Sequence, residues 1–331
     1  MMDARELVRR AISFQYPVRP PLYFRTDPER SDIVQAPYYA PTNFIDTEKS
    51  RDELGCIWEN TLGTGTGYVV HHPLADWGRL DDYDLPDPRL PSRYEEIEKA
   101  VQKYPDRFVA AALGLSGFGL MTALRGFEDI LSDLYLEQGL FARLAEKVFD
   151  YEMAVIEEIG RRRADGIWFF DDWGTERNLF IKPELWRKVF KPYYTAQFQR
   201  VHALGMRVFF HSCGCVWTII PEMIDAGVDV LNLEQMLLFG ENGQTGYQRI
   251  RQEYGSQVCF TVNVDTQRTL VTGTPEEIRQ EVRHIFQTFD LPQGGFIAFA
   301  DAGKDHNIHK PENLCLVEEL YETEIGKWMS S

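Results

Sequence analysis

The fold is decided by the stretch RVFFHSCGCVWTIIPEMIDAGVDVLNLE, residues 207–234. It contains two nearly continuous apolar runs, RVFFH (207–211) and VDVLNLE (228–234). Such runs are typical of strands in a parallel sheet that is covered on both faces, where apolar and polar residues need not alternate. Each run ends in polar residues, so the stretch predicts two buried strands whose ends carry reactive side chains.

Similar runs recur along the chain, at 108–113 (FVAAAL), 167–171 (IWFFD), 258–265 (VCFTVNVD) and 295–300 (GFIAFA), with 20–24 (PPLYF) as an early candidate. Amphipathic helical patterns lie between them. One begins at Pro183 and ends before Gly205, which is a plausible helix stop. Another begins at Thr274, which can form a capping box with Glu277. Strand–helix alternation with right-handed crossovers predicts an α/β fold.

Two architectures meet these conditions, a doubly wound open sheet and a closed (β/α)8 TIM barrel. The glycine-rich stretch LGTGTGYV (62–69) does not match the dinucleotide fingerprint, and no clear helix follows it, so we interpret it as a loop. We therefore predict a (β/α)8 barrel in one domain, residues 1–331. Residues 1–100 are expected to form an irregular N-terminal part that packs on the barrel, and residues 101–331 the main run of βα units.

Composition excludes several classes of function. The chain has 331 residues and a formal net charge of -16, and such an acidic surface repels nucleic acids and anionic membranes. It has no long apolar run, and residues 1–21 lack the apolar core of a signal peptide, so we expect a cytoplasmic protein. The five scattered cysteines do not indicate a disulfide framework.

Polar side chains gather where the predicted strands end, which is where TIM-barrel enzymes carry their catalytic groups. Polar residues also resume at any strand-to-loop junction, so a single one carries little weight, but the whole set favours a functional rim. Its members are Asp171, Asp172, His211, Cys213, Glu234, Gln235, Asn263, Asp265 and Asp301.

His211 and Cys213 form the sharpest local signal. Residues two apart on an extended chain share a face, so an imidazole and a thiol here can bind one zinc ion. A catalytic zinc site needs a third protein ligand, for which Glu234 and Asp301 are the candidates. Cys215 is near in sequence, but its side chain would have to turn inward after Gly214.

Longer segments resemble the uroporphyrinogen decarboxylase superfamily, in the right order and over most of the chain. They are HPLADWGRLDDYDLPDP (72–88), DDWGTERNLFIKPELWRKVFKPYY (171–194), VHALGMRVFFHSCGCVWTIIPEMIDAGVDVLNLEQ (201–235), GGFIAFADAG (294–303) and HKPENL (309–314). The resemblance implies a TIM barrel with its active site at the C-terminal ends of the strands.

The chain departs from the true decarboxylases of that superfamily at two functional places. Those enzymes carry an Arg-Gln-Ala-Gly-Arg stretch soon after the N-terminal RPP, and its arginines hold substrate carboxylates. Here RPP (19–21) is followed by LYFRTDPERSD (22–32), which supplies only Arg25 and Arg30. The decarboxylases also have a histidine after the last strand, at a place that falls near Ala302 in this chain.

The H-x-C-G motif, here residues 211–214, resembles the corrinoid-dependent methyltransferase branch. In that branch the His and Cys bind zinc together with a late cysteine, whose place also falls near Ala302; Asp301 is the nearest replacement. The resemblance implies transfer of a methyl group from a small methylated donor, such as a methoxylated compound, to a corrinoid carried by a partner protein. From their positions at the predicted strand ends, we expect His211, Glu234, Asp301 and Asp172 as catalytic residues. We expect substrate contacts among Trp168, Trp173, Arg25, Arg177 and Asn263, although part of the aromatic set must be barrel packing.

Two other functions stay open at this point. One is metal-free decarboxylation of a porphyrinogen, with Arg25, Arg177 and Asp172 as the candidate residues. The other is a binding barrel without catalysis, because both the late cysteine and the late histidine (His306 and His309 lie further downstream) are missing from the expected place.

Overall fold

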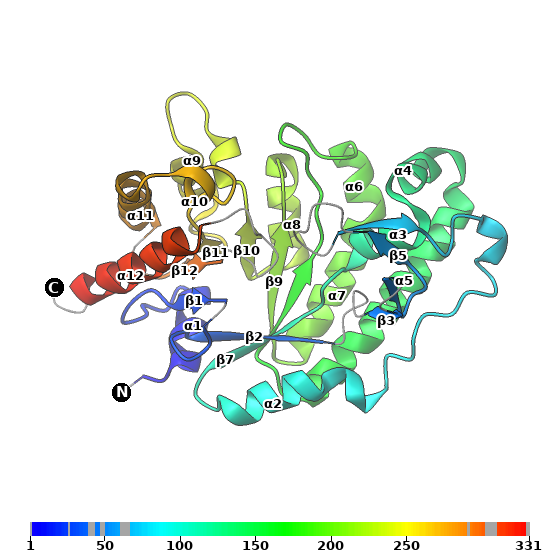
Figure 1. The fold of residues 1–331 in the computed structure, drawn as a ribbon, viewed down its shortest axis with the longest axis horizontal. Helices are drawn as coiled ribbons and strands as arrows, with labels where there is room; N and C mark the ends of the chain where they lie inside the picture. Colours follow the sequence, from blue (N-terminus) through cyan, green and yellow to red (C-terminus); the bar gives the residue numbers. More distant parts are fainter. Residues whose placement is uncertain are drawn as a thin grey trace.

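The structure is a computed structural model that describes residues 2–25, 27–38, 44–46, 50–59, 67–289, 292–301 and 310–328. Its centre is a sheet of eight parallel strands (Figure 1). In their order around the sheet, these are β1 (Leu22–Phe24), β12 (Phe296–Ala300), β11 (Cys259–Val262), β10 (Val230–Leu233), β9 (Arg207–Ser212), β8 (Gly166–Phe170), β7 (Phe108–Ala112) and β2 (Ile33–Pro37).

The sheet curls until its first and last strands meet. The backbone amide of Asp32 donates to Leu22 O (2.8 Å), and the Asp32 carboxylate accepts from the amide of Leu22 (2.7 Å), which ties the start of β2 to β1. The predicted (β/α)8 barrel is thereby confirmed. Six strands and β1 coincide with the predicted apolar runs. β2 was missed because IVQAP (33–37) has a glutamine in its middle and a proline at its end.

Helices surround the strands (Figure 1). They are α1 (Ala4–Ile12), α2 (Glu95–Lys103), α3 (Gly117–Arg125), α4 (Phe127–Leu136), α5 (Gln138–Arg161), α6 (Pro183–Val189), α7 (Lys191–Ala203), α8 (Ile220–Ala226), α9 (Gly246–Tyr254), α10 (Thr269–Thr272), α11 (Pro275–Phe289) and α12 (Pro311–Trp328). Among the described residues no helix is both long and apolar enough to cross a membrane.

Two helix predictions can be compared directly with the structure. The capping box before α11 is confirmed, because the amide of Thr274 donates to the Glu277 carboxylate (2.7 Å) and the amide of Glu277 donates to Thr274 Oγ1 (3.3 Å). The single helix expected from Pro183 to Gly205 is wrong. It is divided into α6 and α7, because Pro192 has no amide hydrogen and its ring obstructs the preceding turn.

The part of the chain before β7 is largely irregular, as expected, and its regular elements are short. It contains a small antiparallel sheet of β3 (Phe44–Asp46), β4 (Arg51–Asp52), β5 (Ile57–Glu59) and β6 (Tyr68–His71), besides supplying β1 and β2 to the barrel. Contacts with Ala123, near the end of α3, hold this sheet at the barrel. The Cys56 thiol lies 3.3 Å from Ala123 O, and His72 Nδ1 lies 2.8 Å from the same atom. Residues 62–66 of the predicted glycine-rich loop lie outside the described residues.

Aromatic side chains fill the interior of the barrel. Tyr23 stacks on Phe299 and Trp168 stacks on Phe209, each with ring centroids 4.9 Å apart, and all four side chains are buried. The interior is therefore a packed core, and any reaction must take place above it, at the rim.

Two buried acids fix the start of α3, one from the barrel and one from a neighbouring helix. The Asp171 carboxylate, just after β8, accepts from the amides of Phe118 (2.9 Å) and Gly119 (2.8 Å). The Glu152 carboxylate on α5 accepts from the amide of Gly117 (2.6 Å) and from Gln197 Nε2 (2.8 Å). Burial raises the pKa of Glu152 from 4.5 to about 7.

This raised pKa predicts a pH-dependent stability. The folded state holds the Glu152 proton more tightly than the unfolded chain, so the contribution of this carboxyl is fully present below pH 4.5 and is lost as pH rises through about 7. Glu152→Gln should remove the loss, and the difference in unfolding free energy between variant and parent should grow by up to about 3 kcal/mol over that window. Urea unfolding between pH 4.5 and 7.5 measures it. Glu146→Gln, at an exposed position of the same helix, is the control; the same pH trend in both variants would contradict the assignment.

Candidate active site

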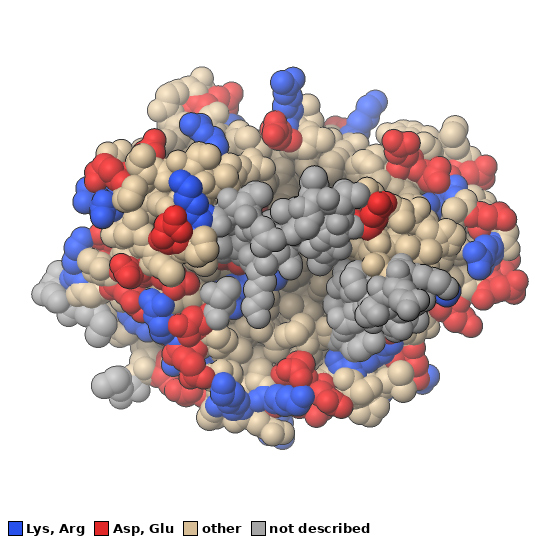
Figure 2. Space-filling model, in the orientation of Figure 1, with Lys and Arg blue, Asp and Glu red and all other residues tan. Residues whose placement is uncertain are grey.

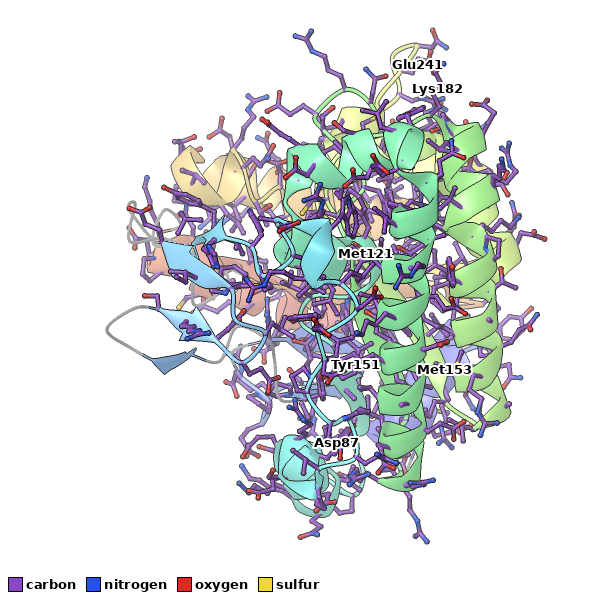
Figure 3. All side chains as sticks on the ribbon, turned by 90° about the vertical axis from the view of Figure 1, so that its right-hand side faces the viewer. Asp87, Met121, Tyr151, Met153, Lys182 and Glu241 are labelled. Carbon is purple, nitrogen blue, oxygen red and sulfur yellow. The ribbon has the colours of Figure 1, made fainter. Side chains whose placement is uncertain are left out.

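Six consecutive strands of the barrel deliver the candidate residues to one rim. Running along the sheet, Arg25 follows β1, Asp301 follows β12, Asn263 follows β11 and Glu234 follows β10. His211 and Cys213 lie at the end of β9, and Asp172 follows β8. Because all these strands are parallel, their carboxyl ends share one end of the barrel. Figure 3 shows the same polarity: Lys182 and Glu241, from loops after β8 and β10, lie at one end of the molecule and Asp87 at the other.

His211, Cys213 and Asp172 converge at this rim. His211 Nε2 lies 3.5 Å from Cys213 Sγ and 3.5 Å from Asp172 Oδ1. The amide of Cys213 donates to Asp172 Oδ1 (2.7 Å), which holds the carboxylate beside the thiol. Within the part of the chain that the structure describes, this is the only group of three such side chains whose ligand atoms all lie within 4.8 Å of one another.

Asn232 orients the imidazole of His211. It lies directly opposite His211 on the neighbouring strand β10, and its Oδ1 is 2.7 Å from His211 Nδ1. The amide oxygen can only accept, so Nδ1 carries the proton, and a neutral His211 directs the lone pair of Nε2 toward Cys213 and Asp172. Histidine ligands of metals are usually held in this way. Sequence reasoning missed Asn232; the one available signal was an amide inside the apolar run VLNL.

The three side chains fit a zinc ion. An imidazole nitrogen, a thiolate sulfur and a carboxylate oxygen are all zinc ligands, and three protein ligands with one open position are typical of catalytic sites. The third member differs from the two candidates expected from the sequence. Asp172 is in place, whereas the Glu234 carboxylate accepts from Thr266 Oγ1 (3.3 Å) and the Asp301 carboxylate accepts from Arg25 (2.7 Å).

The electrostatics of the group favour a positive charge at its centre. Burial disfavours the charged imidazole, but Cys213 in its thiolate form and the carboxylate of Asp172 outweigh it and raise the pKa of His211 well above its ordinary value. Desolvation raises the pKa of Asp172, yet the hydrogen bond and charge of His211, together with the bonds from Cys213, more than offset this and lower it overall. Burial raises the pKa of the Cys213 thiol. Either a proton on His211 or a metal ion can supply the charge that this position favours.

A second group of charges continues along the rim. Asp301 is buried, and its carboxylate accepts from the guanidinium of Arg25, whose side chain is 42% exposed. Asn263 Nδ2 donates to the backbone oxygen of Asp301 (3.0 Å). Burial raises the pKa of Glu234; Asp301 raises it further, whereas His211 and Arg25 lower it. Glu234 therefore lies within electrostatic range of both groups and is partly shielded from water.

An open cavity with aromatic walls adjoins the His211 group. Its space, counted out to the surrounding solvent, is about 1110 Å³. His211 and Asp172 line one side and His72 lines another, and no Lys or Arg is among the described lining residues. The remaining walls are mainly apolar, from Trp58, Tyr68, Val69, Leu115, Phe118, Ala123, Phe127, Phe170 and Phe180. On the face of the molecule that Figure 2 shows, acidic and basic side chains are intermixed.

Three expected substrate contacts lie elsewhere. Trp173 is fully buried and packs on Phe118 with ring centroids 4.5 Å apart, so it cannot touch a ligand. Trp168 is 1% exposed and belongs to the barrel core below Phe170. Arg177 lines a different surface pocket, together with Cys215, whose side chain therefore does not turn inward. Trp168 lies within β8 and points into the barrel interior, Trp173 follows the strand end but packs among helices, and Arg177 lies further along the loop, so a place near a strand end did not decide which side chains reach the cavity.

The places expected for the late cysteine or histidine, near Ala302, and the downstream His306 and His309 lie outside the described residues.

The role of Asn232 can be tested by substitution. Asn232→Leu removes the acceptor of the Nδ1–H bond, which frees the ring and leaves a buried donor unpaired. We expect zinc affinity to fall about 10- to 100-fold, as is typical for loss of such a partner. Competitive titration against a chelator measures it. Asn232→Asp keeps an acceptor at the same place and should retain zinc binding; an unchanged affinity in Asn232→Leu would remove Asn232 from the site.

Comparison with known proteins agrees with this architecture. The family model for uroporphyrinogen decarboxylase (URO-D) matches residues 51–304. A uroporphyrinogen decarboxylase of Methylococcus capsulatus is 26% identical over 294 residues, covering 84% of this chain and 78% of that protein. One from Thermus thermophilus is 25% identical over 184 residues, covering 53% of this chain and 51% of the relative. A methyltransferase from Methanosarcina mazei superimposes with a TM-score of 0.74, covering 98% of this chain and 99% of that one; at 15% identity this likeness shows the fold alone.

Proposed function

Because the chain belongs to the uroporphyrinogen decarboxylase family, we propose that it is an enzyme of the methyl-transferring kind within it. It takes a methyl group from a small methylated donor, such as a methoxylated compound, and passes it to a corrinoid held by a partner protein. The observation that carries the proposal is the group His211, Cys213 and Asp172, with the imidazole oriented by Asn232. A decarboxylase has no need of a soft metal-binding group at the rim.

The reaction places two demands on the site. The bond between methyl carbon and donor oxygen breaks, its electron pair stays on oxygen, and the methyl carbon forms a new bond with the electron pair of the reduced acceptor. The oxygen then needs a proton. A zinc ion bound by His211, Cys213 and Asp172 would supply Lewis-acid stabilisation of that oxygen.

The chain's own residues meet the remaining demands. Glu234, with its raised pKa, can hold the proton that the leaving oxygen takes up. The aromatic walls bind the body of the donor and exclude water, and the open mouth leaves the methyl group accessible for in-line approach of the acceptor. Cys213 and Cys215 are free thiols, which suits the reducing cytoplasm that we propose as its location.

Decarboxylation of a porphyrinogen is the second candidate, favoured by the names of the relatives and by Arg25 at the rim. Its substrate carboxylates need several cations. Arg25 is already paired with Asp301, Arg177 lines a different pocket, and the described walls of the cavity carry no Lys or Arg. The charge distribution therefore favours a neutral substrate.

The test mixes the zinc-loaded protein with a reduced corrinoid protein and a panel of methoxylated donors. We expect the absorbance of methyl-cobalt to appear only when donor and protein are both present. Carbon dioxide release from uroporphyrinogen without methyl-cobalt from any donor would overturn the proposal in favour of the decarboxylase. Tight binding of the corrinoid protein without turnover of either substrate would favour a binding barrel.

A further inference from the structure

His72 is a polar residue of the cavity for which the reaction proposed above has no use. It directly follows β6 of the small antiparallel sheet and lines the cavity together with the aromatic side chains. The catalytic candidates, in contrast, follow strands of the barrel. Its neighbour Leu74 is fixed to the end of α3, because the amide of Leu74 donates to Leu124 O (2.9 Å). The ring is half-buried and held in one place.

The hydrogen bond of His72 determines what it offers to a ligand. Its Nδ1 lies 2.8 Å from the backbone oxygen of Ala123. A carbonyl oxygen only accepts, so Nδ1 carries the proton, and in the neutral ring Nε2 is an acceptor. Among the described residues Nε2 has no hydrogen-bond partner. On the side of the small antiparallel sheet, the cavity thus combines apolar walls with a fixed acceptor, the arrangement by which small-molecule sites orient their ligands.

We propose that His72 is the specificity-determining residue of this cavity, and that it selects donors with a flat, apolar, aromatic body that carries a hydroxyl or N–H group. An aromatic ring that enters the cavity displaces water from Nε2. A ligand with a hydroxyl replaces the lost hydrogen bond, whereas one without it leaves Nε2 unpaired. A site that must hydrogen-bond to its ligand discriminates between ligands with and without that group more strongly than apolar contact alone does.

The inference rests on the proposed function for the methyl group that is transferred, but the binding preference can be measured without any transfer. Calorimetric titration of the full chain with the methoxyphenol isomers and with methoxybenzene gives the ratio of the two affinities. We expect at least one methoxyphenol to bind about ten- to hundredfold more tightly than methoxybenzene.

Two substitutions distinguish the role of Nδ1 from that of Nε2 in the His72 ring. The side-chain amide of His72→Asn can still donate to Ala123 O but offers no acceptor at the position of Nε2, so the ratio should fall to near one. His72→Gln places an acceptor near Nε2 and should keep most of the preference. His71→Asn, at the exposed neighbouring position that is not among the cavity's lining residues, is the control and should leave the ratio as it is.

The outcomes distinguish this inference from the proposed function. Equal binding of both ligands by the unsubstituted chain, or an unchanged ratio in His72→Asn, overturns the role of His72 whatever the reaction is. The expected ratios without methyl-cobalt formation from any methylated donor support His72 and overturn the methyltransferase. A thermal melt of each variant shows whether a change in ratio comes with a change in fold; a preference lost only in variants with an altered melt also counts against the inference, because His72 then acts through structure alone.

Discussion

Cys213→Ala should bind zinc more than about a hundredfold more weakly than the unsubstituted protein, and methyl transfer should fall by at least the same factor. The expected loss is larger than for Asn232→Leu because a ligand is removed instead of its support. The remaining His211 and Asp172 offer two ligands to an ion that takes three or more protein ligands in its catalytic sites. Metal analysis after dialysis gives the stoichiometry, and the methyl-cobalt assay gives the rate.

Cys215→Ala is the matched control for this experiment. It removes a thiol two residues further along the same loop, but one that lines the pocket with Arg177 instead of the His211 group. It should bind zinc as the unsubstituted protein does. Full zinc occupancy in Cys213→Ala, or equal losses in both variants, would show that the metal site is elsewhere or absent.

The architecture could be predicted from the sequence because buried parallel strands leave a strong signal. The runs at 167–171 and 295–300 contain hardly any polar residue before their last position, and both became barrel strands. β2 left no such signal, since it is short and ends in Pro37. Its place in the barrel depends on Asp32, which bonds to Leu22 across a turn that no local pattern reveals.

The membership of the group His211, Cys213 and Asp172 could be predicted only in part. His211 and Cys213 are two residues apart on one strand, so their common direction follows from backbone geometry. Asp172 comes from the next strand, and its neighbour Asp171 has the same side-chain chemistry. The two point to opposite sides: Asp171 is buried against the start of α3, and Asp172 accepts from the amide of Cys213. Only the register between β8 and β9 decides which of them joins the group.

His72 and Asn232 show a different limit. His72 is held by a hydrogen bond to Ala123, far away in the chain, and Asn232 bonds to His211 on the neighbouring strand. Neither residue belongs to a recognisable sequence spacing. Trp173 shows the converse. Its position after a strand end suggested a substrate contact, but the tight packing of Phe118 and Phe190 around it makes it part of the core.

Gly214 connects the His211 group to the rest of the rim through its backbone. It has φ +80°, a conformation that L-residues adopt at a cost, and a Cβ atom added here would lie 2.1 Å from the backbone oxygen of Gly174. That oxygen belongs to the loop after β8 that also carries Asp172. The amide of Cys215 donates to Thr175 O (2.7 Å), which holds the two loops together. The close approach is therefore part of what keeps Cys213 and Asp172 adjacent.

Gly214→Ala is consequently expected to destabilise the fold by about 3 kcal/mol, from the strained φ and from the overlap with a backbone that cannot rotate away. It should also weaken zinc binding strongly, although it changes no ligand, because the loop after β8 must move and take Asp172 with it. Gly205→Ala separates the effect of the strained φ from the effect of the backbone overlap. Gly205 has a similar φ of +78°, but nothing lies within 4 Å of an added Cβ, so this variant should lose only about 1 kcal/mol and keep its zinc affinity. Urea unfolding and chelator competition on both variants decide the matter: equal destabilisation would show that the contact between the loops is soft, and full zinc affinity in Gly214→Ala would show that the contact does not hold the His211 group in place.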